Sequence, residues 1–286
     1  MDTVNTLADL RTAVDHWKRQ GHSIAFVPTM GNLHAGHFAL IKAARSRADR
    51  VVASVFVNPT QFGEGEDFES YPRTLEADQR GLADHGCDLL YAPDVQDMYN
   101  TAAPRAAVHV PVVSDGLCGE RRPGHFDGVA TVVIKLINRV TPDCALFGEK
   151  DYQQLMVLRK MAADLDLATE IVGIPTVRES DGLAMSSRNQ YLSPAERRVA
   201  GQLHAALERC ALKIKQGEQV EKSIETERKK LSKSGFRVEY FELRRARDLA
   251  EISSPASESV LLVAAKLGSA RLIDNMRFRY EGPSQN

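Results

Sequence analysis

The sequence predicts an α/β protein with a doubly wound, parallel-sheet (Rossmann-like) N-terminal domain and a smaller α+β C-terminal domain. Apolar runs alternate with segments of helical period up to about residue 177, which is typical of successive β-α-β units. The runs are almost continuously apolar, as strands buried on both faces of a parallel sheet require. Beyond residue 177 the chain turns polar, then helical and then strand-like. We therefore predict domains at 1–176 and 177–286.

The elements of the first domain follow from these patterns in chain order. Strands are expected at 24–28, 51–57, 87–93, 145–147 and 170–177, with a further short strand at 108–110. Helices are expected at 7–20, from about 38 to 48, at 72–85, at 129–140 and at 155–165. The segment at 129–140 is strongly amphipathic, because its apolar residues recur every three or four positions.

The second domain begins with a polar loop and a capped helix. Ser193 and Glu196 form a capping box, with Pro194 at the first helical position. The charged run at 221–233 predicts a helix with a solvated face. Three strands are expected after it, at 238–243, 260–265 and 271–280. This order of elements predicts an α+β domain, whose mobile loop at 185–188 would close over a site in the first domain.

Composition excludes several classes of protein. The 286 residues carry a net charge of −1, which argues against a nucleic-acid partner held through its phosphates. The apolar fraction of 43 % is sufficient for a globular core. The four cysteines lie far apart, so we expect free thiols in a reducing cytoplasm and no zinc site. We see neither a secretory signal nor an apolar run long enough to cross a membrane, and so expect a cytoplasmic protein.

The sequence PTMGNLHAGH at 28–37 joins the first buried strand to a helix. In an open α/β sheet such a turn lies at the carboxyl end of a strand, where ligands bind. His34 and His37 are three positions apart and share a helix face, and Gly36 leaves room for a ligand near the backbone. A helix N-terminus offers free N–H groups to a phosphate. The alternative is that the histidines only cap the helix or face solvent.

Two further polar stretches are candidates for the same site. Lys150, in GEKD at 148–151, could neutralise a phosphate, although it could also be a solvated side chain beside a capping aspartate. MSSR at 185–188 offers two hydroxyls and a cation that could close over a triphosphate, or it could be an ordinary polar turn. Gln61 and Gln154 are amides near strand ends that could orient a hydroxyl or a carboxylate, unless they are merely exposed.

Six stretches together carry a resemblance to one family. They are PTMGNLHAGH at 28–37, FVNPTQF at 56–62, YPRTL at 71–75, RPGHFDGVATVV at 122–133, FGEKDYQQL at 147–155 and PTVRESDGLAMSSRNQYLS at 175–193. In order and spacing they resemble the pantothenate synthetases (pantoate–β-alanine ligases), which are HxGH-containing nucleotidyltransferases. The 185–188 segment is similar in role to the KMSKS loop of class I aminoacyl-tRNA synthetases.

The resemblance implies an ATP-dependent condensation of pantoate with β-alanine through a pantoyl adenylate, with release of AMP and diphosphate. It implies ATP as a substrate with Mg²⁺, no organic prosthetic group and a homodimer. The implied ATP site consists of Met30, Gly31, Asn32, Leu33, His34, Ala35, Gly36, His37, Gly148, Glu149, Lys150, Asp151, Val177, Met185, Ser186, Ser187 and Arg188. The implied catalytic residues are His37 (the family's proton donor), His34, Lys150 and Arg188.

The resemblance also implies substrate ligands outside the nucleotide site. Gln61 and Gln154 correspond to the pantoate ligands, and Gln61 is also near β-alanine. Arg122 and Tyr71 match positions close to the site. Ala77 departs from many relatives, which carry an acid there beside the residue equivalent to Asp78, so we name no protein ligand for a metal.

Two other functions are compatible with parts of the sequence. Another adenylate-forming or nucleotidyl-transferring enzyme, such as a phosphopantetheine adenylyltransferase or a small tRNA synthetase relative, would share the HxGH turn. The lack of a basic RNA-binding region and the presence of FVNPTQF argue against both. A non-catalytic nucleotide-binding module would not need two histidines, Lys150 and Arg188 together.

Overall fold

The computed structural model describes residues 1–99 and 106–282, and its internal contacts divide the chain into two units. The first unit comprises Met1–Glu149 and Val157–Pro175. The second comprises Lys150–Met156 and Thr176–Asn286. The second unit therefore includes a short segment that interrupts the first one in sequence.

The first unit is built on a parallel sheet, in which the described residues form six strands in the order β1-β4-β3-β2-β5-β6. The strands are β1 (Asp2–Val4), β2 (Ile24–Thr29), β3 (Arg50–Val55), β4 (Leu89–Tyr91), β5 (Cys144–Gly148) and β6 (Glu170–Ile174). Phe26 of β2 pairs with Val52 of β3 on one side and with Ala145 of β5 on the other. The strand order reverses at this central pair, β2 and β5, and open α/β sheets bind ligands at the carboxyl ends of such strands.

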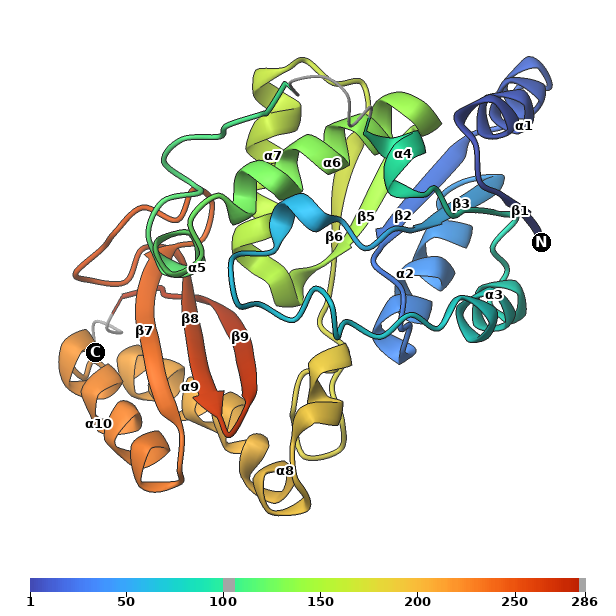
Figure 1. The fold of residues 1–286 in the computed structure, drawn as a ribbon. Coiled ribbons are helices and arrows are strands. Elements are labelled where there is room, and N and C mark those ends of the chain that lie inside the picture. Colours follow the sequence, from blue (N-terminus) through green and yellow to red (C-terminus); the bar gives the residue numbers. More distant parts are fainter. Residues whose placement is uncertain (100–105, 283–286) are drawn as a thin grey trace. The chain divides into compact units, whose positions relative to one another are not determined.

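Helices cover both faces of this sheet (Figure 1). The longer ones are α1 (Leu7–Arg19), α2 (Ala35–Arg45), α3 (Leu75–Asp84) and α6 (His125–Val140), and the short ones are α4 (Val95–Met98), α5 (Leu117–Arg121) and η1 (Pro59–Gln61). Two more, η2 (Glu149–Asp151) and α7 (Tyr152–Asp164), contain residues of both units. Ala25 and Val27 of β2 share a core with Ile41 of α2 and Leu82 of α3, all fully buried. Because strand residues alternate between faces, the fully buried Phe26 belongs to the opposite face.

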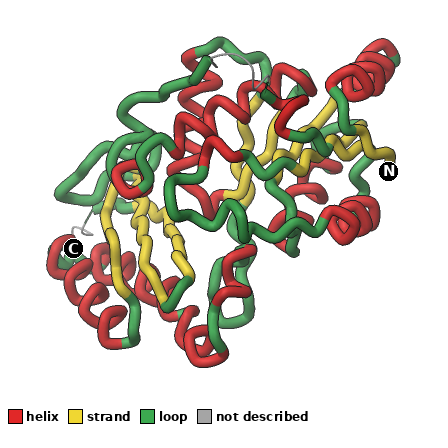
Figure 2. Tube along the Cα trace, in the orientation of Figure 1, coloured by secondary structure: helices red, strands yellow, loops and turns green. Residues whose placement is uncertain are grey.

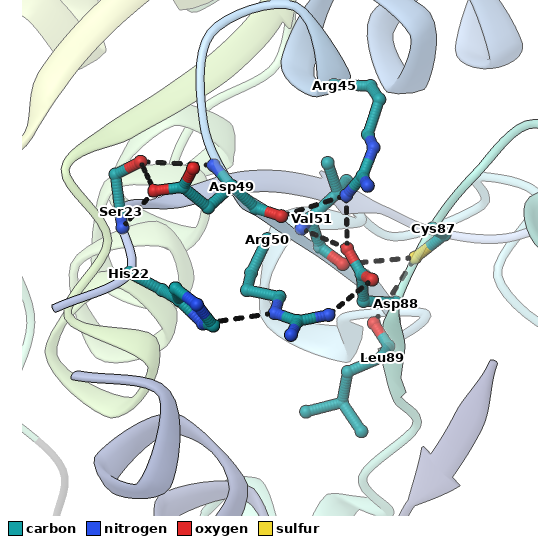
Figure 3. Close-up of polar contacts among 9 residues, drawn as sticks. All are labelled: His22, Ser23, Arg45, Asp49, Arg50, Val51, Cys87, Asp88 and Leu89. Carbon is teal, nitrogen blue, oxygen red and sulfur yellow. Dashed lines mark hydrogen bonds and ion pairs between the residues drawn. The ribbon is translucent and has the colours of Figure 1, made fainter. Parts of the chain in front are cut away.

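Aspartates hold the amino ends of the strands together (Figure 3). Asp88 precedes β4 and accepts the backbone N–H of Val51 in β3 at 2.8 Å. Asp49 precedes β3 and accepts the backbone N–H of Ser23, just before β2, at 2.9 Å. Arg45 pairs with Asp88 at 3.0 Å. The charged groups at this edge are thus used for structure, at the opposite ends of the strands from the candidate site.

The second unit has an antiparallel sheet in which the described residues form three strands in the order β7-β8-β9. Its elements are η3 (Ser187–Tyr191), α8 (Pro194–Ala200), α9 (Gln202–Lys215), α10 (Val220–Lys233), β7 (Arg237–Arg245), β8 (Glu258–Leu267) and β9 (Ala270–Arg279). Figure 2 shows the three strands beside helices, and α9 and α10 share a core with the sheet through Leu207, Leu231 and Leu261. The predicted fold class is confirmed in both parts.

Several predicted elements need correction. The strand expected at 108–110 is absent, because the Val108 N–H donates to the Thr131 hydroxyl at 2.9 Å and the segment pairs with no strand among the described residues. The helix expected from residue 72 begins at Leu75, and the strand expected to reach residue 57 ends at Val55. We did not predict β1, α4 or α5. Glu227, in the run expected to be solvated, is fully buried against three cations.

Candidate active site

Two histidines form the start of α2. His34 is the N-cap, and its Nδ1 accepts the backbone N–H of Gly36 at 3.1 Å. His37 reaches back, and its Nδ1 accepts the backbone N–H of His34 at 3.3 Å. Because each Nδ1 is an acceptor, a neutral ring carries its proton on Nε2. Both histidines thus help to cap the N-terminus of α2, and the N-terminus of a helix can also bind a phosphate.

The loop before these histidines is held by Asp78 of α3. Gly31 and Asn32 have positive φ angles of 83° and 52°. The buried Asp78 carboxylate accepts the backbone N–H groups of Asn32 at 3.0 Å and Leu33 at 2.8 Å, and the Thr74 hydroxyl at 3.1 Å. A Cβ on residue 31 would lie 3.0 Å from Asp78 Oδ2 and 3.1 Å from Val55. Asp78 thus fixes the loop conformation, and a side chain at position 31 would be strained by these close contacts and by the positive φ angle.

A cavity of about 320 Å³ opens beside this loop, where β2, β3 and β4 end. It is lined by Met30, Gly31, Val55, Phe56, Val57, Phe68, Arg73, Thr74, Leu75, Asp78, Ala92, Pro93, Asp94 and Val95. The lining is mostly apolar, with Arg73, Asp78 and Asp94 as its charged members. Such a cavity can receive an uncharged group of a bound molecule, while the polar loop holds a charged one.

Gln61 lies at the end of η1 in a buried polar network. Its side-chain Oε1 accepts Asn58 Nδ2 at 3.1 Å, and its Nε2 lies 2.9 Å from Met30 Sδ. Its backbone oxygen accepts His125 Nδ1 at 2.7 Å and Arg122 Nη2 at 3.4 Å. Both the amide and the backbone of Gln61 are therefore fixed before any substrate arrives.

An ion pair between Arg122 and Glu66 supports this network. Arg122 binds Glu66 with two hydrogen bonds of 2.6 Å each, and its Nη1 lies 2.8 Å from His125 Nε2. Burial alone would raise the pKa of Glu66, but the Arg122 guanidinium outweighs burial and holds that pKa below its usual range. His125 donates from Nδ1 to the Gln61 carbonyl and accepts at Nε2 from Arg122, so the ring is neutral. Tyr71, also near the site by resemblance, is buried edge-on against Phe62.

Lys150 and Gln154 belong to the second unit. Lys150 lies in η2, its side chain is only 19 % exposed, and its Nζ is 3.6 Å from Asp151 Oδ1. The Lys150 backbone oxygen accepts Asn275 Nδ2 at 3.0 Å. Gln154 is half-buried on the first turn of α7. The backbone of Lys150 is thus anchored from β9, a strand far away in sequence.

A short hairpin brings Val177 and Met185 together in the second unit. The Met185 N–H donates to the Val177 oxygen at 3.0 Å, and Arg178 and Ala184 form an antiparallel β-bridge through their backbones. Ser186 then caps η3 by accepting the Arg188 N–H at 3.2 Å. The polar segment at 185–188 is therefore a capped turn that leaves the end of the hairpin.

The structure groups the sequence-predicted site residues within each unit. In the first unit the 30–37 loop and Gln61 meet through Met30, and in the second Val177 joins the segment at 185–188. Sequence reasoning missed Asn58, Glu66, His125, Asp274 and Asn275. Asn58 and His125 stand in stretches that carried the family resemblance, whereas the other three had no signal.

The described residues contain no group of three or more His, Cys, Asp and Glu side chains that could hold a metal. None of the helices among these residues has the length and apolar character to cross a membrane.

Comparison with known proteins gives the family. Residues 2–277 match the family model described as pantoate-beta-alanine ligase. The chain is 52 % identical over 286 residues to a pantothenate synthetase of Pseudomonas fluorescens, covering 99 % of this chain and 100 % of the relative. It superposes with a TM-score of 0.90 and 46 % identity on the pantothenate synthetase of Thermus thermophilus, covering 96 % of this chain and 99 % of that one.

A second solved structure carries ligands. The pantoate-beta-alanine ligase of Francisella tularensis, complexed with beta-gamma ATP and beta-alanine, superposes with a TM-score of 0.81 and 32 % identity over 99 % of both chains. The match with the family extends over both units and all six stretches that carried the resemblance. The chain belongs to the pantoate-β-alanine ligase family.

Proposed function

We propose that this chain condenses pantoate with β-alanine at the expense of ATP, through a pantoyl adenylate, and releases AMP and diphosphate. Membership of the family over residues 2–277 supports the overall reaction. The structural observation that carries the proposal is the start of α2, which follows the carboxyl end of β2 and whose first turn His34 and His37 cap. A helix N-terminus at the carboxyl end of a parallel strand suits a polyphosphate.

The first step activates the pantoate carboxylate. One of its oxygens attacks the α-phosphorus of ATP, the bond from that phosphorus to the β-phosphate oxygen breaks, and diphosphate leaves with the negative charge. Groups that stabilise this charge in the transition state lower the barrier. We assign that role to His34, His37, Lys150 and Arg188, with His37 as the proton donor.

The second step is attack by the amine. The neutral amine of β-alanine attacks the acyl carbon of the adenylate, the bond from that carbon to the AMP oxygen breaks, and the nitrogen loses a proton. The step needs orientation of the two reactants more than a protein nucleophile. We assign this orientation to Gln61, held by Asn58 and His125, and to Gln154, with Gln61 contacting both pantoate and β-alanine.

We assign ATP binding to three segments and one residue: 30–37, 148–151, Val177 and 185–188. ATP enters as its Mg²⁺ complex, because Mg²⁺ is commonly bound through substrate phosphates. Asp78 does not suit a metal, since both of its oxygens already accept protein N–H or O–H donors. No organic prosthetic group is needed for either step.

The half-reactions test the proposed function. With pantoate present and β-alanine absent, labelled diphosphate should exchange into ATP, and addition of β-alanine should then give one AMP per pantothenate. Exchange that requires β-alanine would contradict a stepwise adenylate. A non-catalytic nucleotide-binding module would bind ATP and give neither exchange nor AMP.

We further propose that the protein acts as a cytoplasmic homodimer. Membership of the family supports the homodimer. The four cysteines are not joined in disulfides, so the fold does not require an oxidising compartment. Sedimentation equilibrium at micromolar concentration should give twice the chain mass of 31.6 kDa. A monomer mass over that range would contradict the homodimer.

A further inference from the structure

Two neighbouring polar residues of β9, Asp274 and Asn275, lie buried in the second unit. Asp274 is 4 % exposed and Asn275 is 7 % exposed. Successive residues of a strand point to opposite faces of the sheet. Burial of a polar side chain costs free energy unless the side chain is hydrogen-bonded. The hydrogen-bond partners of Asp274 and Asn275 therefore indicate the structural role of the two residues.

Asn275 holds the segment that contains Lys150. Its Nδ2 donates to the Lys150 backbone oxygen at 3.0 Å. The same segment is held a second time, because the Tyr152 hydroxyl donates to the Ala246 oxygen at 2.8 Å. These two bonds span 125 and 94 positions in sequence, and they lie within the second unit. The backbone from which the Lys150 side chain extends is therefore fixed by the small sheet.

Asp274 holds the hairpin that leads to the segment at 185–188. Its two carboxylate oxygens accept Arg178 Nη1 at 2.6 Å and Nη2 at 2.9 Å. Arg178 Nη1 also donates to the Gly182 oxygen at 3.1 Å, across the hairpin. His204 of α9 lies on the other side, with its Nδ1 3.4 Å from Asp274 Oδ2. A bidentate pair of this kind fixes orientation as well as distance.

We propose that Asp274 and Asn275 are positioning residues that hold Lys150 and Arg188 in one rigid frame. The inference rests on the proposed function, in which both cations act on one triphosphate. Cations on two separate segments would each have to be ordered when the nucleotide binds. Anchoring both segments on adjacent residues of one strand fixes their spacing beforehand, and such preorganisation favours the transition state.

Asn275→Asp tests the link to Lys150. This nearly isosteric change removes the N–H donor and places a carboxylate against the Lys150 carbonyl. We expect single-turnover adenylation to slow by tenfold to a hundredfold, with less than a threefold change in the KM for ATP, because misplacement by about 1 Å can cost a hundredfold in rate. In the Lys150→Ala background the same change should alter the rate by less than twofold.

A matched control lies on the same strand. Arg279→Gln changes a side chain that is 80 % exposed, and it should leave adenylation at the wild-type rate. An Asn275→Asp loss of equal size in both backgrounds would overturn the proposal, since it would show a general structural effect. A wild-type rate in Asn275→Asp would overturn it as well. Should that variant fail to fold, Asn275→Ser, which shortens the donor, is measured in the same two backgrounds with the same criteria.

Asp274→Asn tests the link to Arg188 and needs the corresponding background, Arg188→Ala. A slow rate that disappears in that background supports the proposal, and one that persists contradicts it. Amide hydrogen exchange without nucleotide separates this proposal from the proposed function. Asn275→Asp should speed exchange in residues 152–156 at least fivefold, and Asp274→Asn should do so in residues 178–185, while α2 is unchanged. Unchanged exchange in these segments would overturn the anchoring even if the enzyme makes pantothenate.

Discussion

Single buried side chains determine the shape of the candidate site, and Asp78 is the clearest case. Its carboxylate orders a loop in which two consecutive residues have positive φ angles. The histidines that follow begin a helix whose first N–H groups they cap themselves. The conformation of the loop proposed to bind ATP is therefore maintained in part by Asp78, a residue outside the proposed ATP site.

We predict that Asp78→Asn disrupts this loop. The new amide nitrogen would face N–H donors, and a hydrogen bond to a charged group contributes about 1.5–3 kcal/mol. Urea unfolding should show a loss of about 2 kcal/mol, and the KM for ATP should rise. Asp84→Asn, at an exposed position of the same helix, is the control and should change neither quantity. A stable Asp78→Asn with normal ATP use would show that the loop does not depend on this carboxylate.

Gln61 supports a second prediction at this scale. If its amide orients pantoate, Gln61→Ala should weaken the use of pantoate much more than the binding of ATP. One lost hydrogen bond contributes about 1 kcal/mol, and the Asn58 amide, which would lose one of its two acceptors, adds to the loss. Initial rates at varied pantoate, together with ATP titration by calorimetry, measure the two effects. Equal losses for both substrates would mean that we have misassigned Gln61.

Packing between η1 and α6 sets the position of Gln61 at the scale of elements. Gly128 of α6 lies so close to η1 that a Cβ would be 2.3 Å from the Thr60 oxygen. Asn58 Nδ2 also donates to the Gly128 oxygen at 3.2 Å. The helix α6 and the turn η1 therefore contact each other through their backbones. This contact joins the stretch at 56–62 to the stretch at 122–133.

Gly128→Ala should push η1 away from α6. Overpacking of a tight contact typically costs about 1–3 kcal/mol, so thermal unfolding should occur at a lower temperature. The KM for pantoate should rise, because the Gln61 amide moves with η1. Asn138→Ala, exposed on the same helix, should affect neither measurement. Unaltered pantoate use in a folded Gly128→Ala would separate η1 from the substrate site.

The sequence predicted elements that are periodic in themselves and missed those that depend on distant partners. The continuous apolar run of β3 and the amphipathic α6 needed no tertiary information. β1 has only the residues Asp2–Val4, and it is a strand because it pairs with β4. The segment at 108–110 alternates like a strand, but it pairs with no strand in the part of the chain that the structure describes. For the same reason the HxGH turn could be predicted, whereas the anchoring of Lys150 by Asn275 could not.

Acid stability is a property of the whole molecule, and two buried carboxylates contribute to it. Burial would raise the pKa of Glu227, but Lys230 and Arg209 outweigh burial and lower that pKa below 4.5. Burial would likewise raise the pKa of Asp274, but His204 and Arg178 lower it below 3.8. A carboxyl with a lowered pKa in the folded state stabilises the protein fully above its unfolded pKa, and this contribution is lost as pH falls through the folded pKa.

We therefore expect the urea concentration at the unfolding midpoint to decrease once the pH is lower than about 4.5. Between about pH 6 and pH 8 the midpoint should be insensitive to the titration of these groups. Glu227→Gln should lower the midpoint at pH 7, by about 2 kcal/mol in the free energy of unfolding, and should reduce its fall between pH 5 and pH 3. Glu225→Gln, on the same helix with a side chain that is 57 % exposed, is the control and should follow the wild-type curve. Identical acid slopes in Glu227→Gln and wild type would contradict this origin of acid sensitivity.

The interrupted layout of the chain has a consequence for its biosynthesis and cleavage. A ribosome completes Lys150–Met156 long before it reaches Asn275, which lies 125 positions after Lys150, so this segment must wait for β9 before it can pack. A fragment that starts at Thr176 would have to fold with the place of Tyr152 empty. Conversely, a protease that cuts once between Pro175 and Thr176 should leave two pieces that elute together on gel filtration, since the earlier piece still supplies part of the later one's interior.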